Sequence, residues 1–290
     1  MNDPARFRFD RGAVGRDFSR ASAHYDAAAQ LQAGVNDELV QRLQFFQLQP
    51  RAILDLGCGT GRGAAALRRR YPRAQVVAVD LAPGMVAAAH RRQRFWRRYH
   101  CVRADGGALP FAAQSFDLVF SSLMFQWCDD PGALFTQLQQ VLRPGGLLLF
   151  STFGPDTLQE LRAALAQADA QSHVSAFADM PLLGAAMSGA GLAEPVMDRE
   201  LIRHHYADAR ALMQELRSIG AQHAAADRRR SLTGPGRLRA MTAAYEGQRT
   251  AAGLPATWEI IYGAAFAGQP RQSAGAETVV PIGAVGRRRP

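Results

Sequence analysis

The chain has 290 residues, 48% of them hydrophobic and 20% charged, which is enough to bury the core of one large α/β domain with an appended element. No segment approaches the roughly 20 consecutive apolar residues of a membrane helix, and Asp3 and Asp10 lie where a signal or transit peptide carries no acids. We therefore expect a cytoplasmic protein without a membrane partner. The formal net charge of +9 comes from 34 basic residues, all of them arginine, and favours an acidic partner without identifying it.

Residues 1–50 are expected to form an N-terminal helical segment. Within it, residues 22–49 carry apolar side chains at a helical spacing, and the pattern ends at Pro50. The apolar stripe of this single predicted helix consists of Leu31, Val35, Leu39, Leu43 and Phe46.

Strands and helices then alternate. Short apolar runs predict strands at 52–57, 75–81, 100–105, 116–122 and 147–153. Helical patterns fill the segments after the first two of these strands, and another begins at Pro131 and ends before Pro144. This alternation indicates a parallel sheet covered by helices on both faces.

The remaining elements complete the predicted sheet. Helices are expected from Pro155 onward and at 179–191, and two further strands at 194–206 and 256–267. The fold class is therefore α/β, with an open, Rossmann-like, mostly parallel sheet of seven strands and a helical insert at 208–253 before the last strand. We expect the main domain to comprise 51–207 and 254–267, the insert to close over the carboxyl edge as a lid, and 268–290 to be a flexible tail.

The segment LDLGCGTGRG (54–63) lies between the first strand and the first helix of the sheet. Gly57, Gly59 and Gly61 allow a sharp turn and a close approach of a ligand to backbone N–H groups. Asp80 ends the second strand, where a carboxylate can bind both hydroxyls of a ribose. The G-x-G-x-G spacing differs from the G-x-G-x-x-G of enzymes that bind a dinucleotide pyrophosphate.

Together with LPFAAQSFDLVFSS (109–122) and LRPGG (142–146), this pattern resembles the class I S-adenosylmethionine-dependent methyltransferases over residues 51 to about 153. The resemblance implies S-adenosylmethionine as cofactor. It implies that Gly57 to Gly61 wrap its methionine part, Asp80 binds the ribose, Asp105 accepts the adenine amino group and Ser121 lies near the ammonium. The residues expected to bind the cofactor are Asp55, Gly57, Gly59, Gly61, Asp80, Leu81, Asp105, Gly106 and Ser121.

Four further segments resemble one particular family of methyltransferases. FSRASAHYDAAAQLQ (18–32), SLMFQWCDDP (122–131), STFGPDTLQELR (151–162) and LMQELRSIGAQH (212–223) resemble the malonyl-[acyl-carrier protein] O-methyltransferase family. That resemblance implies methylation of the free carboxylate of a malonyl thioester on an acyl-carrier protein, the step that primes the pimeloyl chain of biotin. STFGPDTLQELR and the tail are also similar to a mitochondrial complex I assembly factor that hydroxylates an arginine.

Candidate substrate residues lie outside the glycine motif. We expect Tyr25 and Trp127 to be catalytic, as walls of the active site, and His24, Gln126 and Arg217 to bind substrate. Each also has a structural interpretation: His24 and Tyr25 can anchor a helix, Gln126 and Trp127 can pack in the core, and Arg217 can be solvated. The arginine runs at 91–98 and 228–230 are expected to be solvated faces.

No metal or disulfide is expected, because the three cysteines have no paired spacing and no histidines at the intervals of metal ligands. A carboxylate acceptor is ionised at neutral pH and needs no base, which agrees with the absence of an obvious catalytic acid–base group. Two other enzyme classes stay open: a small-molecule, quinone-type methyltransferase, which needs a base, and the arginine hydroxylase. A nucleic-acid partner is not expected, since the chain lacks an N-P-P-Y tetrapeptide.

Overall fold

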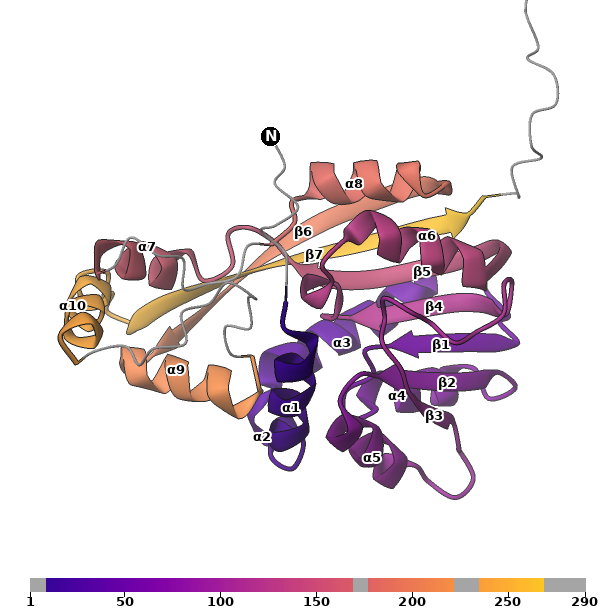
Figure 1. Ribbon diagram of the computed structural model, residues 1–290, viewed down its shortest axis with the longest axis horizontal. Coiled ribbons are helices and arrows are strands. Elements are labelled where there is room, and N and C mark those ends of the chain that lie inside the picture. Colours follow the sequence, from indigo (N-terminus) through magenta and orange to yellow (C-terminus); the bar gives the residue numbers. More distant parts are fainter. Residues whose placement is uncertain (1–8, 169–176, 222–234, 269–290) are drawn as a thin grey trace, which may run out of the picture.

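The computed structural model describes residues 9–168, 177–221 and 235–268 and contains one seven-stranded sheet (Figure 1). Its strands follow the order β3-β2-β1-β4-β5-β7-β6. β7 is antiparallel to both of its neighbours, whereas β3, β2, β1, β4 and β5 pair in parallel. The predicted fold class is confirmed. The strands are β1 (Ala52–Leu56), β2 (Gln75–Asp80), β3 (His100–Arg103), β4 (Phe116–Ser122), β5 (Leu142–Phe153), β6 (Leu192–Tyr206) and β7 (Leu254–Ala267).

Helices cover both faces of the sheet because successive strand residues point to opposite sides. Ile53 packs in the core beneath α3 and α4, whereas its neighbour Leu54 packs in the core beneath α6 and α8. The helices are α1 (Arg11–Ala21), α2 (Tyr25–Ala28), α3 (Gln30–Arg42), α4 (Arg62–Arg70), α5 (Pro83–Arg92), α6 (Pro131–Val141), α7 (Gln159–Ala168), α8 (Met180–Gly189), α9 (Ala209–Ser218) and α10 (Pro235–Glu246).

The N-terminal segment is not the single helix predicted for 22–49. The chain forms α1 before it, and the helical run breaks between α2 and α3 at Ala29, whose backbone angles (φ −87°, ψ 49°) are not helical. α1 begins at Asp10, whose side chain accepts a hydrogen bond from the Ala13 backbone N–H as an N-cap. The predicted apolar stripe is correct, since Leu31 and Leu39 are buried against the sheet.

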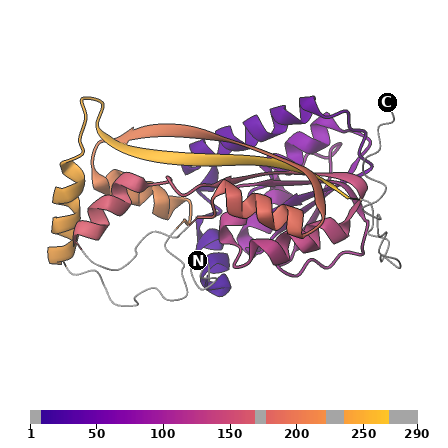
Figure 2. The same cartoon turned by 90° about the horizontal axis from the view of Figure 1, so that it is seen from above.

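The last two strands are longer than the others and change the shape of the molecule. β6 and β7 extend beyond the ends of β1 to β4, and α7, α9 and α10 gather around the projecting end (Figures 1 and 2). α9 and α10 form the described part of the predicted insert, whose residues 222–234 lie outside the described ranges. The predicted tail lies outside them from residue 269 onward.

The insert reaches the N-terminal segment through its first helix. The turn after α9 brings Gly220 so close to α1 that a Cβ atom on it would lie 3.1 Å from the carbonyl oxygen of Asp17. Gly220 also has a φ of +74°, which side chains other than glycine rarely adopt. α9 therefore abuts α1 and α2 at the carboxyl side of the sheet.

Candidate active site

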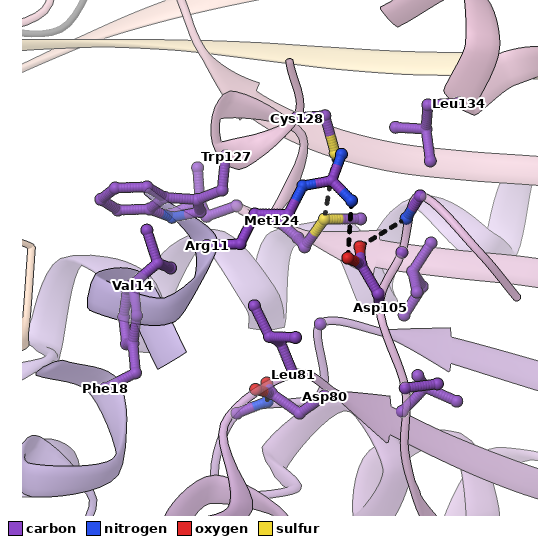
Figure 3. Close-up of a pocket in the computed structure, with 18 of the residues that line it drawn as sticks. Arg11, Val14, Phe18, Asp80, Leu81, Asp105, Met124, Trp127, Cys128 and Leu134 are labelled. Carbon is purple, nitrogen blue, oxygen red and sulfur yellow. Dashed lines mark hydrogen bonds and ion pairs between the residues drawn. The ribbon is translucent and has the colours of Figure 1, made fainter. Parts of the chain in front are cut away.

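A pocket opens at the carboxyl ends of β1 to β4, where α1 and α2 fold over the sheet (Figure 3). In open α/β sheets this edge is the usual place for a ligand. The cavity has a volume of about 180 Å³. It is lined by Arg11, Val14, Phe18, Tyr25, Leu56, Gly57, Gly59, Val79, Asp80, Leu81, Met85, Ala104, Asp105, Gly106, Gly107, Ser122, Leu123, Met124, Trp127, Cys128, Asp129, Asp130, Ala133, Leu134 and Gln137.

The turn after β1 requires its glycines. Gly57, Gly59 and Gly61 have φ values of +74°, +52° and +84°, a region that side chains other than glycine rarely adopt. A Cβ at Gly57 would lie 2.4 Å from Met124, whereas the space beside Gly59 is open. Gly57 and Gly59 line the pocket, and Gly61 lies behind them as the N-cap of α4. The turn thus presents bare backbone to the pocket.

Asp80 fixes this turn and also faces the cavity. Its Oδ2 accepts a hydrogen bond of 2.9 Å from the Gly59 backbone N–H, and its Oδ1 accepts one of 2.8 Å from Ala82. Burial raises the pKa of the Asp80 carboxyl, and the hydrogen bonds from Ala82 and Gly59 oppose that rise. The adjacent Leu81 lines the pocket beside it.

Asp55 lies beneath the pocket rather than on its wall. Its side chain is 2% exposed, and its Oδ2 has no hydrogen-bond partner among the described residues. Burial raises the pKa of Asp55 to about 7, a hydrogen bond from the Ala64 backbone opposes that rise, and the charge of Asp80 adds to it. A buried carboxyl oxygen without a partner is costly when it is ionised, which agrees with the raised pKa of Asp55.

The two serines at the end of β4 face opposite ways. Ser121 is fully buried, and its hydroxyl donates a hydrogen bond of 2.8 Å to the Leu56 carbonyl oxygen. Ser122 lines the pocket. The structure therefore does not bring the predicted Ser121 into the cavity, and its unpredicted neighbour takes that place.

Asp105 follows β3 and carries an ion pair to the N-terminal helix. Its Oδ1 accepts a hydrogen bond from the Gly107 backbone N–H, and its Oδ2 lies 2.6 Å from Nη1 of Arg11. Nη2 of Arg11 lies 3.3 Å from Asp129. Asp105 and Gly106 both line the pocket. Arg11, which the sequence reasoning missed, therefore connects α1 to two acids at the carboxyl edge.

Aromatic rings of the N-terminal segment pack against Trp127, which follows β4, and together they form one wall of the pocket. Trp127 makes edge contacts with Phe9 and Phe18, with ring centroids 5.7 and 5.3 Å apart, and Phe18 lies 6.4 Å from Tyr25. Burial raises the pKa of the Tyr25 phenol, and the nearby carboxylates of Asp80 and Asp26 raise it further. Tyr25 is therefore a neutral hydrogen-bond donor at physiological pH. Tyr25 and Trp127 both line the pocket.

The other three predicted substrate residues do not line this cavity. His24 is exposed just before α2. The Gln126 amide is used within the fold, because its Nε2 donates to the Leu123 carbonyl at 2.6 Å and its Oε1 accepts from Thr152 at 3.2 Å. Arg217 is on α9, the helix that abuts α1 and α2. Among the described residues, no cluster of histidine, cysteine or acids could hold a metal, and no helix is long and apolar enough to cross a membrane.

The residues present fit S-adenosylmethionine. Bare backbone at Gly57 and Gly59 leaves room for an amino-acid moiety, and Asp80 can accept hydrogen bonds from two ribose hydroxyls. Asp105 can accept from an adenine amino group, and Leu81 adds apolar surface beside it. Nothing in this arrangement calls for a pyrophosphate.

Comparison with known proteins shows which protein family the chain is similar to. A family model described as a methyltransferase domain matches residues 54–150. The chain is 47% identical over 261 residues to the "Malonyl-[acyl-carrier protein] O-methyltransferase" of Xylella fastidiosa, covering 89% of this chain and 88% of that protein. It is 46% identical over 271 residues to the protein of that name from Methylovorus, covering 91% and 92%. A Coxiella burnetii relative, "Malonyl-[acyl-carrier protein] O-methyltransferase 1", is 38% identical, covering 98% of both chains.

Solved structures share the fold at low sequence identity. The YcgJ protein of Bacillus subtilis superposes with a TM-score of 0.58 at 15% identity, covering 80% of this chain and 98% of that one. Haemonchus contortus phosphoethanolamine N-methyltransferase 2, solved with phosphomonomethylethanolamine and S-adenosylhomocysteine, gives 0.53 at 20% identity, covering 80% and 53%. These likenesses establish the fold.

Proposed function

The chain belongs to the malonyl-[acyl-carrier protein] O-methyltransferase family, and we propose that it transfers the methyl group of S-adenosylmethionine to the free carboxylate of a malonyl thioester on an acyl-carrier protein. The single observation that supports this most is the pocket at the carboxyl edge, where Asp80 and Asp105 flank a glycine turn and Tyr25 and Trp127 close the far side. The methyl ester would then prime the pimeloyl chain of biotin.

The cofactor's place follows from the acids and glycines. We assign the ribose hydroxyls to Asp80, the adenine amino group to Asp105 with Leu81 and Gly106 beside it, and the methionine part to the turn at Gly57 and Gly59. When bound, S-adenosylmethionine supplies an electrophilic methyl group on a sulfonium. Asp55, Gly61 and Ser121 support this wall from behind: Asp55 and Ser121 are buried, and Gly61 starts α4.

The acceptor needs orientation and desolvation more than deprotonation. A malonyl carboxylate is ionised at neutral pH, and the described lining of the pocket contains no histidine that could serve as a base. The protonated Tyr25 hydroxyl can donate a hydrogen bond to one carboxylate oxygen and so orient the other. The edge-packed rings of Trp127 and Phe18 exclude water from the same wall. A phenol or carbon acceptor, as in a quinone-type methyltransferase, would need a base, whereas the four carboxylates of this lining already accept hydrogen bonds from backbone N–H groups or from Arg11.

The substrate's route is proposed to pass beside α9. Because α9 abuts α1 and α2, Arg217 would lie at the rim of the pocket and attract an anionic carrier. His24, exposed beside Tyr25, would lie on the same rim, and Gln126 would hold the segment before Trp127 in place. We propose that α9 roofs the acyl chain, whereas α1 and α2 roof the cofactor.

The reaction is tested by incubating the protein with labelled S-adenosylmethionine and each of three acceptors: malonyl-carrier protein, malonyl-coenzyme A and free malonate. We expect a base-labile methyl ester on the carrier-bound malonyl group and the highest kcat/KM for that acceptor. Succinyl-carrier protein, with one more methylene, is the matched control for pocket length. Preference for malonyl-coenzyme A would contradict the carrier-protein assignment, and absence of methyl transfer to all three would contradict carboxyl methylation.

A further inference from the structure

The chain carries a protruding aromatic turn on the edge of the sheet opposite the pocket. Phe95 and Trp96 occupy the corners of a tight turn closed by a hydrogen bond of 2.9 Å from the Arg97 N–H to the Arg94 carbonyl. Their side chains are 69% and 86% exposed, and their rings touch each other at 4.8 Å between centroids. Two adjacent large apolar side chains in water contribute little to folding and point to a binding role.

Arginines without acidic partners surround this turn. Arg68 links it to the end of α4, because its Nε donates a hydrogen bond of 3.1 Å to the Arg98 carbonyl, and Arg98 lies over the ring of Phe95. Between Asp55 and Asp105 the only acid in the sequence is Asp80, which lies in the pocket. The arginines of this surface that form no ion pair with a described residue are Arg68, Arg70, Arg73, Arg91, Arg94, Arg97 and Arg98.

The position of this basic-aromatic tip (Phe95, Trp96 and those seven arginines) separates it from the reaction. α4 and α5 run back from the carboxyl edge, and β3 starts at His100, directly after the turn (Figure 1). β2 alone places about 17 Å of sheet between the two edges, at roughly 3.3 Å per residue. A thioester arm delivered at the tip would have to pass around the sheet to reach Asp80. The tip is therefore not the entrance for the substrate.

We propose that the basic-aromatic tip docks the protein on an anionic lipid surface. Tryptophan and phenylalanine rings settle at the boundary between headgroups and acyl chains, and arginines around them pair with lipid phosphates. The tip suits this partner because its two rings are exposed on a tight turn, whereas a single-stranded nucleic acid needs a groove that follows its backbone. A second copy of the chain would bring the same positive charge to the contact, so two such tips would repel each other. This proposal differs from the expectation of no membrane partner, because it places the protein at the surface of a membrane.

The test measures binding of the full chain to sedimenting vesicles of phosphatidylcholine with and without phosphatidylglycerol. We expect binding to the anionic vesicles only, with a blue shift of Trp96 fluorescence that Trp96→Phe abolishes. The affinity for these vesicles should fall about tenfold or more in Phe95→Ser/Trp96→Ser and in Arg94→Glu/Arg97→Glu. The matched controls are Phe45→Ser, which removes another exposed ring, and Arg20→Glu. Methyl transfer in solution should be unchanged in all variants, so this result is independent of the proposed function.

Several outcomes would overturn the proposal. Equal binding to neutral vesicles would do so, as would loss of binding only in the arginine variant, because that pattern is unspecific adsorption of a basic protein. A single-stranded RNA that displaces the protein from vesicles and protects Trp96 would identify a nucleic-acid surface instead. A raised KM for malonyl-carrier protein in the Phe95→Ser/Trp96→Ser variant would identify a carrier-protein surface.

Discussion

Arg11 lies 2.6 Å from Asp105, so the first helix of the chain is fastened to the residue that follows the third strand of the sheet. The same guanidinium reaches Asp129, whose other oxygen accepts the backbone N–H of Phe9 at 2.8 Å. Three contacts therefore hold the N-terminal segment over the cofactor pocket. Because Asp105 is also the proposed acceptor for adenine, closure of α1 and binding of the cofactor use the same carboxylate.

The first prediction concerns this ion pair. Arg11→Gln should weaken binding of S-adenosylhomocysteine about tenfold, chiefly by faster dissociation, because charge-assisted hydrogen bonds contribute about 1.5–3 kcal/mol and partial exposure reduces that figure. Stopped-flow displacement and calorimetry measure the two quantities. Arg16→Gln, an exposed arginine on the same helix, is the control and should leave both unchanged. Tighter binding in Arg11→Gln would mean that Arg11 competes with adenine for Asp105.

The second prediction concerns Asp80. Asp80→Ala should weaken cofactor binding by about ten- to a thousandfold, because the ribose hydroxyls lose their acceptor. The structure adds a second effect, since Asp80 also holds the Gly59 and Ala82 N–H groups. Asp80→Asn keeps one acceptor oxygen and should be less severe. Thermal unfolding without ligand separates loss of stability from loss of binding, and unchanged affinity in a folded Asp80→Ala protein would disprove the assignment.

The third prediction is a pH dependence of stability from Asp55. Its pKa of about 7 in the folded protein exceeds the ordinary value of 3.8, so between about pH 4 and pH 7 the native state binds more protons than the unfolded state. Stability from this group is therefore highest below pH 4 and falls as the pH rises toward 7. Asp55→Asn should remove that slope and gain about 2–4 kcal/mol relative to the wild type at pH 8.

Urea unfolding of the wild type and Asp55→Asn at about pH 5 and about pH 8 measures this difference, because all other titrating groups are common to both proteins. Asp117→Asn is a suitable contrast. The carboxyl of Asp117 pairs with Arg143, and its pKa is lowered despite the opposing effect of burial. Its loss should therefore destabilise the protein at both pH values. Parallel pH curves for wild type and Asp55→Asn would refute the buried neutral carboxyl.

The sheet could be predicted because each strand and helix is indicated by the sequence pattern of its own segment. Apolar runs, glycines and prolines alternate along residues 51–153, and the structure follows them closely. The direction of each side chain within a strand was harder to predict. Ser121 and Ser122 differ by one position, and strand alternation buries Ser121, whose hydroxyl donates to the Leu56 carbonyl, and places Ser122 in the lining of the pocket. The sequence shows two adjacent serines but not which of them lines the pocket.

The position of α1 over the pocket could not be predicted from the sequence, because it depends on tertiary contacts. α1 has few apolar residues, and it is held over the pocket by partners about a hundred residues away, such as Asp105 and Asp129 for Arg11. Likewise, Gln126 looks like a substrate ligand from its place after β4, yet Leu123 and Thr152 occupy its amide. Polar residues at a sheet edge can serve the fold or the ligand, and only the contacts distinguish these uses.

The fourth prediction concerns Tyr25. Tyr25→Phe should lower kcat about tenfold with little change in cofactor affinity, because it removes one hydrogen bond to the acceptor and keeps the ring. Since the pKa of the phenol is raised, its ionisation should not appear in the rate profile below about pH 9. Tyr71→Phe, at the far end of α4, is the matched control. A rate that rises with pH through a Tyr25-dependent step would instead make the phenolate a base.

The last prediction concerns the carrier protein. An acidic carrier should be attracted to arginines on β6 and α9, so the rate at low substrate concentration should fall steeply with added salt. Arg199, Arg203, Arg210 and Arg217 are the candidates, but Arg199 already pairs with Asp156 and Glu259. The available positions are therefore Arg203, Arg210 and Arg217, none of which forms an ion pair with a described residue.

Arg217 should matter more than Arg210, because it lies at the end of α9 whose following turn touches α1, whereas Arg210 lies at the opposite end. Arg203→Glu/Arg217→Glu should raise KM for malonyl-carrier protein severalfold and leave kcat nearly intact, since charges at a rim mainly alter association. KM for malonyl-coenzyme A should change less. Arg94→Glu/Arg97→Glu, on the opposite edge of the sheet, carries the same charge change and should leave KM for the carrier substrate unchanged. If the two double variants behave alike, net charge rather than a local surface governs association, and the entrance beside α9 is wrong.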